Sequence, residues 1–201
     1  MEFIKEFAIF LHKKGIIKFG EFTLASGKKS SYYVDLRLVP SYPQEFRKMV
    51  KFLENRISED IGLDKFESIV SVPTGGLVIA SALAIETVKP LIYVRSKPKN
   101  YGTSKSVEGK IQQGMNVVMI DDVATTGGSV VNAIKSLKEE KITIKDAYVI
   151  VNRMEGATEA LAQLDVKLHS ILDVLEISQI LFNENIINED ILDKVKKQIN
   201  Y

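Results

Sequence analysis

The 201-residue sequence contains no cysteine. The chain can therefore form no disulfide and can supply no thiolate, either as a nucleophile or as a metal ligand. Charge of one sign is not in excess, because 27 Lys and Arg residues are balanced by 26 Asp and Glu. A net charge of +1 gives no general attraction to nucleic acid or to a membrane surface. Any basic site in this chain must be local.

Long hydrophobic runs are also missing. No apolar segment approaches the roughly 18 residues that a membrane-spanning helix requires. The first residues include Glu2 and Glu6, whereas a signal peptide would carry only basic residues there. We therefore expect a cytoplasmic protein with neither a membrane nor a nucleic acid as partner. The length suits one domain that spans residues 1–201.

The most informative segment comprises residues 117–129. Its first part, 117–120, is a short apolar run typical of a buried strand in a parallel sheet. Asp121 and Asp122 follow directly, and a turn of small residues at 125–128 then leads into apolar residues at helical spacing. Such a turn presents backbone N–H groups at the positive end of a helix, where a phosphate monoester can bind. Two adjacent aspartates alone would fit an ordinary solvated turn, but together with the Thr-Thr-Gly-Gly turn they favour a ligand site.

Strands and helices alternate regularly from residue 66 onward. Strands are predicted at 68–72, 91–94, 117–120, 147–151 and 167–174, and helices at 43–57, 77–86, 155–163, 176–183 and 189–199, with one more ending near 139. This order predicts an α/β fold with a central, mainly parallel sheet flanked by helices. Its ligands should bind at the carboxyl ends of the strands.

The chain is expected to have three parts. Residues 1–40, a helix at 2–14 and a hairpin after it, should form a small N-terminal cap on the sheet. Residues 66–175 should form the core. The long polar segment 95–113 interrupts this core and carries five basic residues against one acid between 95 and 110. A loop of this length is typical of a lid, although a solvated loop without function would look the same.

A second turn of small residues, 73–76, also joins a strand to a helix. Its sequence is Pro-Thr-Gly-Gly, and its backbone N–H groups could bind a diphosphate. The alternative is a tight connection that needs glycine for its dihedral angles. A basic lid and the phosphate-binding turn at 125–128 are expected at the same edge of the sheet. We therefore favour an anion site at 73–76.

Residues 117–129, Val-Val-Met-Ile-Asp-Asp-Val-Ala-Thr-Thr-Gly-Gly-Ser, resemble the phosphoribosyl diphosphate signature of the type I phosphoribosyltransferases. The segment 95–109 resembles the catalytic lid loop of the orotate branch of this family. In that loop Ser96 replaces a basic residue and Lys97 follows it. Ala25 and Gly75 stand where some relatives carry lysines. The resemblance covers about residues 15–180.

Two further segments fit the orotate branch. Residues 22–37 are similar to the segment whose aromatic residues cover the base, and stacking on a flat pyrimidine would suit Tyr33. Tyr32 is as well explained by packing in the core. The turn at 151–156 matches the family's Asp-Arg-x-Glu-Gly turn, in which the arginine binds the orotate carboxylate. A guanidinium group suits a planar carboxylate, so Arg153 is expected to have this role, with a surface arginine in an ion pair as the alternative.

The resemblance implies an orotate phosphoribosyltransferase that makes orotidine 5′-monophosphate and diphosphate from orotate and phosphoribosyl diphosphate. The implied catalytic residues are Lys99, Asp121 and Asp122. Those implied for phosphoribosyl diphosphate are Arg95, Lys97, Lys99, Tyr101, Asp121, Asp122, Val123, Ala124, Thr125, Thr126, Gly127, Gly128 and Ser129. Those implied for orotate are Thr125, Arg153 and Tyr33. The resemblance also implies Mg2+ bound through the diphosphate and ribose hydroxyls, without a firm protein ligand, and a homodimer whose lid reaches the neighbouring site.

Two rival functions remain. A purine or uracil phosphoribosyltransferase would share the 117–129 signature, but Arg153 and the basic lid argue against it. A nucleotide-sensing regulatory protein could also use this fold. It would carry a second basic face or a helix-turn-helix extension, and the sequence indicates neither.

Overall fold

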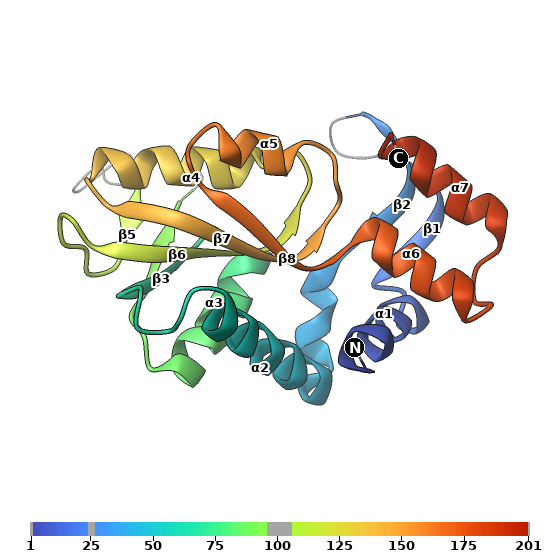
Figure 1. The fold of residues 1–201 in the computed structure, drawn as a ribbon, viewed down its shortest axis with the longest axis horizontal. Helices are drawn as coiled ribbons and strands as arrows, with labels where there is room; N and C mark the ends of the chain where they lie inside the picture. The colour runs from blue at the N-terminus through green and yellow to red at the C-terminus, as the bar shows by residue number, and fades with distance from the viewer. Residues whose placement is uncertain (1, 24–26, 96–105, 201) are drawn as a thin grey trace.

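The computed structural model describes residues 2–23, 27–95 and 106–200 (Figure 1). Within these ranges the elements follow one another in this order: α1 (Glu2–Lys13), β1 (Ile17–Thr23), β2 (Lys29–Val34), the 3-10 helix η1 (Leu36–Ser41), α2 (Pro43–Asp60), β3 (Ser68–Ser71), α3 (Gly75–Thr87), β4 (Leu91–Val94), β5 (Val107–Glu108), β6 (Asn116–Ala124), α4 (Gly128–Glu139), β7 (Thr143–Asn152), α5 (Ala157–Ala162), β8 (Lys167–Asp173), α6 (Val174–Asn183) and α7 (Glu189–Gln198). No helix of the described ranges is long and apolar enough to span a bilayer.

Six strands form the central sheet in the order β5-β4-β3-β6-β7-β8. All neighbouring strands are parallel except β5, which runs antiparallel to β4. Strand β6 lies between β3 and β7, and its residue Ala124 is in register with Asn152 of β7. The carboxyl ends of β3, β6 and β7 therefore meet at one edge. The predicted α/β fold with a mainly parallel sheet is confirmed.

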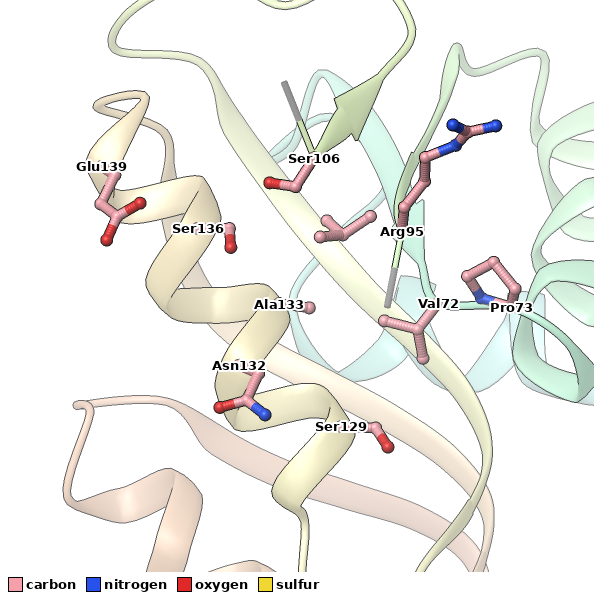
Figure 2. A pocket seen from close by; sticks show the side chains of 10 residues that line it. Val72, Pro73, Arg95, Ser106, Ser129, Asn132, Ala133, Ser136 and Glu139 are labelled. Carbon is pink, nitrogen blue, oxygen red and sulfur yellow. The ribbon is translucent and has the colours of Figure 1, made fainter. Parts of the chain in front are cut away.

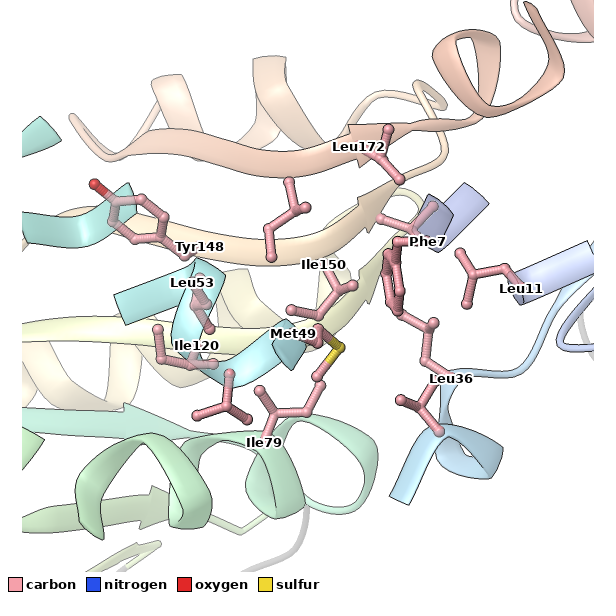
Figure 3. Packing of buried hydrophobic residues seen from close by; sticks show 14 of the residues in the cluster. Phe7, Leu11, Leu36, Met49, Leu53, Ile79, Ile120, Tyr148, Ile150 and Leu172 are labelled. Atoms are coloured by element: carbon pink, nitrogen blue, oxygen red, sulfur yellow. The ribbon is translucent and has the colours of Figure 1, made fainter. Parts of the chain in front are cut away.

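Helices cover both faces of the sheet (Figure 1). On one face α4 and α5 pack on apolar side chains of β3, β4, β6 and β7, among them Val70 and Met119. On the other face, α2 and α3 pack against β6 and β7 through residues such as Met49, Ile79 and Ile150 (Figure 3). Helix α2 is amphipathic, because its buried residues recur every three to four positions.

The hairpin β1–β2 lies beside the main sheet together with α1, α6 and α7 (Figure 1). The last helix, α7, packs on β2, and α1 packs on α6. Phe7 and Leu11 of α1 belong to the same continuous core as Ile120 and Leu172 of the main sheet (Figure 3). The N-terminal hairpin and the C-terminal helices are thus joined to the sheet by shared apolar packing. The sequence predicts a cap made of residues 1–40 alone. In the structure α6 and α7 pack on these residues as well.

Three predicted elements differ from the structure. Residues Val107–Glu108 form strand β5 inside the segment 95–113, which was predicted to be a loop. Strand β6 continues past residue 120 through both aspartates to Ala124. The strand predicted at 147–151 begins four residues earlier, at Thr143. Polar residues at these strand ends, such as Asp121 and Asp122, interrupt the apolar runs that indicate a buried strand.

Candidate active site

The acidic pair lies within the last residues of β6, between β3 and β7. Asp121 is only 7% exposed, and its Oδ1 accepts a hydrogen bond of 2.9 Å from the backbone N–H of Asp122. Oδ1 of Asp122 in turn accepts one of 2.9 Å from the N–H of Val123. Burial, and then the neighbouring Asp122 carboxylate, raise the pKa of Asp121 well above its usual range. The alternative of an ordinary solvated turn, which the sequence disfavours, does not describe Asp121, because this residue is buried within a strand.

The turn at 73–76 lies directly against the two aspartates. A Cβ atom on Gly75 would collide with the carboxylate of Asp122, and one on Gly76 would lie 2.8 Å from the Cα of Asp121. Both positions therefore need glycine while the carboxylates keep their places. This contact gives a physical reason why Gly75, and no lysine, stands at this position. The structure brings the second small-residue turn and the acidic pair together.

The turn after β6 forms a small hollow at the N-terminus of α4. Residues 123–130 and Asp121 line a cavity of about 210 Å³. Gly127, the residue before the helix, has φ = 76°, a conformation that glycine adopts without strain. The first backbone N–H groups of α4 have no partner within the helix. They belong to the residues that line this hollow. The positive end of the helix dipole makes the hollow suitable for a phosphate group.

A larger cavity of about 550 Å³ opens between α4 and the ends of β3 and β4 (Figure 2). Its lining includes Pro73, Arg95 and Ser129, so it adjoins both small-residue turns. Arg95 forms an ion pair of 3.3 Å from Nε to Oε1 of Glu108, and its guanidinium group points away from α4 (Figure 2). The remaining predicted lid residues, Lys97, Lys99 and Tyr101, lie outside the described residues.

Arg153 follows β7 and is joined to the phosphate-binding turn through the backbone. Its N–H donates to the carbonyl of Ala124 at 2.8 Å. Its side chain is buried, and Nε and Nη2 donate to Oε1 of Glu155 at 3.1 and 2.8 Å. Nη2 also donates to Oγ of Ser30 at 3.2 Å, and the guanidinium group stacks on the ring of Tyr32 at 4.6 Å. Arg153 does form an ion pair, but the pair is buried, so the alternative of a surface arginine is wrong.

One side of the Arg153 guanidinium group nevertheless remains available. Among the described residues, Nη1 donates no hydrogen bond. A planar carboxylate could reach Nη1 but could not occupy the Nε–Nη2 edge that Glu155 already holds. Tyr32 is completely buried, in agreement with the core role considered for it.

A second group of side chains, at the end of the hairpin and the start of η1, lies within electrostatic reach of Asp122. Arg37 is held by Asp35, with Nε to Oδ1 at 2.6 Å and Nη2 to Oδ2 at 2.8 Å, and Nη2 also donates to the hydroxyl of Tyr33 at 3.4 Å. Asp35 chiefly, and Tyr33 and Asp122 more weakly, raise the pKa of Arg37 above its usual range. The exposed cation thus lies within electrostatic reach of the acidic pair. Tyr33 is partly exposed beside it, next to Phe22 at 5.8 Å between ring centres.

The sequence gives little indication of the residues that support Arg153. It marks Glu155 only as part of a turn motif and gives no signal for Gln198. In the structure these two residues contact each other, because α7 returns to the hairpin at the far end of the chain. No local pattern signals a contact between positions 43 residues apart. Arg37 is marked only as part of the segment 22–37, although a basic residue after an aromatic strand is a detectable signal.

Comparisons with known proteins agree with this geometry. The family model for the phosphoribosyl transferase domain matches residues 42–180. The orotate phosphoribosyltransferase of Cenarchaeum symbiosum is 46% identical over 196 residues, which is 98% of each chain.

Solved structures show the same relationship. The crystal structure of orotate phosphoribosyltransferase from Aeropyrum pernix has a TM-score of 0.77 at 36% identity and covers 90% of this chain and 99% of its own. The UMP synthase of Leishmania donovani matches 98% of this chain with a TM-score of 0.83 at 30% identity, and this chain spans 42% of that longer protein. The chain belongs to the phosphoribosyl transferase family and, within it, to the orotate phosphoribosyltransferases.

Proposed function

We propose that this protein transfers the ribose 5-phosphate group of phosphoribosyl diphosphate to orotate, a step of pyrimidine nucleotide biosynthesis. The observation that carries the proposal is the joint placement of two features at one sheet edge. The acidic pair lies in the last residues of β6 and the phosphate-binding turn follows that strand. Arg153 directly follows β7, and its N–H is bonded to the carbonyl of Ala124 at 2.8 Å. A donor that carries phosphate and an acceptor that carries a carboxylate fit these two features side by side.

In the proposed reaction a C–N bond forms at the anomeric carbon while the C–O bond to diphosphate breaks. The turn 125–129 binds the 5-phosphate, which fixes the ribose. The carboxylates of Asp121 and Asp122 orient the ribose hydroxyls and stabilise the positive charge that develops on the ring. The turn 73–76 receives the diphosphate through its backbone N–H groups. No covalent intermediate with the protein is needed, because positioning and electrostatics supply the rate.

Orotate is proposed to lie between the hairpin and the strand ends. Nη1 of Arg153 would bind its carboxylate, Thr125 would contact the base, and Tyr33 would stack on it. Uracil and the purines lack this carboxylate, so Arg153 would favour orotate over them. Arg37 adds a further cation within electrostatic reach of Asp122 that can attract either anionic substrate.

Mg2+ is the cofactor that we propose, and the donor set fits it. The diphosphate and the ribose hydroxyls would hold the ion without a firm protein ligand, and Asp121 and Asp122 provide two adjacent carboxylates beside those hydroxyls. Mg2+ typically retains several waters and is bound through one or two carboxylates together with substrate phosphates. When bound, it would neutralise charge on the diphosphate. The chain itself would hold the ribose and the base through the groups named above.

We also propose a homodimer in which each lid, residues 95–113, closes on the neighbouring site. Helix α3 supports this proposal, because it exposes apolar side chains on its outer side. Val78 is 41% exposed and Ile85 is 79% exposed, and their spacing of seven residues places them on the same face. Val88 at the end of the helix is 88% exposed. A second copy of the chain would remove this surface from water. The cytoplasmic location and the lack of a nucleic-acid partner remain predictions.

The proposed reaction is tested by following diphosphate release. The purified protein is mixed with phosphoribosyl diphosphate and Mg2+, with and without orotate, and a parallel reaction contains excess chelator. Release is expected only with orotate and Mg2+ together. No release with orotate would contradict the proposed reaction, and full release in the presence of chelator would contradict the metal requirement alone.

A further inference from the structure

The last helix of the chain reaches the group that holds Arg153. Gln198, at the end of α7, donates through Nε2 to Oε1 of Glu155 at 3.1 Å and to Oγ of Ser30 at 3.0 Å. Its Oε1 accepts hydrogen bonds from the N–H and the hydroxyl of Ser31 at 2.7 and 2.8 Å. One amide side chain thus connects α7, the hairpin and the turn after β7.

Glu155 is the centre of this network. Its side chain is only 3% exposed. Its Oε1 accepts hydrogen bonds from Nε and Nη2 of Arg153, from the hydroxyl of Tyr32 at 2.9 Å and from Nε2 of Gln198. Its Oε2 accepts one from Nζ of Lys28 at 3.0 Å. A carboxylate held by this many donors keeps a single orientation, and the same holds for the guanidinium group that it binds.

The orientation of Arg153 decides which of its nitrogens a ligand can reach. Glu155 occupies the Nε–Nη2 edge, and Ser30 takes a further hydrogen bond from Nη2. The ring of Tyr32 covers one face of the guanidinium group. Only Nη1 is without a hydrogen bond among the described residues. Gln198 restrains both partners of this arrangement, because it bonds to Glu155 and to Ser30.

We infer that Gln198 is a positioning residue for orotate recognition, which acts through Glu155 and Ser30 to fix the guanidinium group of Arg153. This inference rests on the proposed role of Arg153 in binding the orotate carboxylate. It assigns to the C-terminal helix a part in substrate selection, although α7 belongs to neither of the turns that bind phosphate. If Gln198 loses its donor, Glu155 and Arg153 gain freedom to rotate, and orotate should bind less tightly.

A purely structural role for Gln198 would rest on its bonds to Ser31, which attach α7 to β2. Two substitutions separate the roles. Gln198→Glu retains an oxygen that can accept from Ser31, but it has no N–H for Glu155 and places a like charge beside it. Gln198→Leu removes both sets of bonds. The matched control is Gln179→Leu in α6, because Gln179 is exposed and, within the described part of the chain, its side chain bonds only to Asn183 at 3.2 Å.

The experiment measures steady-state kinetics for both substrates in the wild type and the three variants. Gln198→Glu and Gln198→Leu are each expected to raise the KM for orotate about tenfold, the lower end of the effect of losing a hydrogen bond to a charged group. The KM for phosphoribosyl diphosphate should stay within about twofold. The acid limb of kcat/KM for orotate should move to higher pH, because Glu155 loses a donor that favours its charged form. Gln179→Leu should match the wild type.

Three results would overturn the inference. An orotate KM within twofold of the wild type for both Gln198 variants would show that Gln198 does not position Arg153. Equal increases in both KM values, with an unchanged acid limb, would show that it only attaches α7. If the wild type releases no diphosphate with orotate, the proposed function fails as well. Orotate turnover by the wild type in the same assay therefore distinguishes the failure of the inference from the failure of the function.

Discussion

Gly76 lies against the backbone of Asp121, so that a Cβ atom on Gly76 would come within 2.8 Å of the Asp121 Cα. Backbone atoms cannot move aside as a side chain can. The neighbouring Gly75 instead meets the end of the Asp122 side chain, which can rotate. Two adjacent glycines, the first residues of α3, thus contact two adjacent carboxylates in different ways.

The pair Gly75→Ala and Gly76→Ala should therefore behave differently. Gly76→Ala should lower the free energy of unfolding by about 1–3 kcal/mol, the usual cost of overpacking. Gly75→Ala should change stability by less, but should lower turnover because the Asp122 carboxylate must leave its place. Urea unfolding and initial rates for both variants would check this. Equal stability losses, or full activity of Gly75→Ala, would contradict the contact described.

Asp121→Asn should stabilise the free protein while it lowers activity. The folded-state pKa of Asp121 is raised above its ordinary value of 3.8, so the folded state binds more protons than the unfolded state above that pH. Stability is therefore lost as the pH rises from about 3.8 toward the folded-state pKa. At pH 7 the asparagine variant avoids this loss, and its Tm should exceed that of the wild type. Near pH 4 the difference should shrink.

Turnover of the same Asp121→Asn variant should fall by about 10- to 100-fold, because a charge that stabilises the transition state is removed. A lower Tm at pH 7 would contradict the sign of the pKa shift. Unchanged turnover would remove Asp121 from the catalytic residues.

Glu155→Gln should destabilise the protein in a way that depends on pH. Hydrogen bonds from Lys28, Arg153 and Tyr32, against the effect of burial, lower the pKa of Glu155 from 4.5 to about 2. The stabilisation is thus complete above about pH 4.5 and is lost as the pH falls toward 2. At pH 7 the variant should lose about 3 kcal/mol, since Arg153 remains buried without its partner. Urea unfolding at pH 7 and pH 3 should show a smaller difference at pH 3, and an equal difference would contradict the prediction.

Much of the fold follows from patterns within single segments. Apolar runs such as 117–120 locate the buried strands, and the strand–helix alternation predicts the parallel sheet. The end of β6 is less visible, because the two aspartates continue a strand while their polarity indicates a turn. Strand β5 is only two residues long and lies in a polar segment, where no pattern can form.

The phosphate-binding part of the site is likewise local, since Asp121, Asp122 and the turn after them are neighbours in sequence. The support of Arg153 is not local. It combines Tyr32 from the hairpin, Glu155 after β7 and Gln198 from the last helix, and each of these residue types also occurs at other positions of the chain. Their contact is produced by tertiary packing, which no spacing within a segment encodes.

The shared lid leads to a complementation test. Lys99→Ala in the lid and Asp122→Asn in the pocket should each be inactive alone. In a mixed dimer, one site receives both defects and the other combines an intact lid with an intact pocket. Random exchange in equal amounts should restore roughly a quarter of wild-type activity. A mass-tagged subunit shows whether exchange occurs. Exchange without recovery would mean that each lid serves its own pocket.

The most direct test of the central claim is a competition among bases. Orotate, uracil, hypoxanthine and adenine are supplied at equal concentration with phosphoribosyl diphosphate and Mg2+, and the nucleotide products are separated and quantified. If Arg153 selects the base by its carboxylate, orotidine 5′-monophosphate should be the dominant product, by at least about a hundredfold. Comparable amounts of a nucleotide from uracil, hypoxanthine or adenine would contradict the claim.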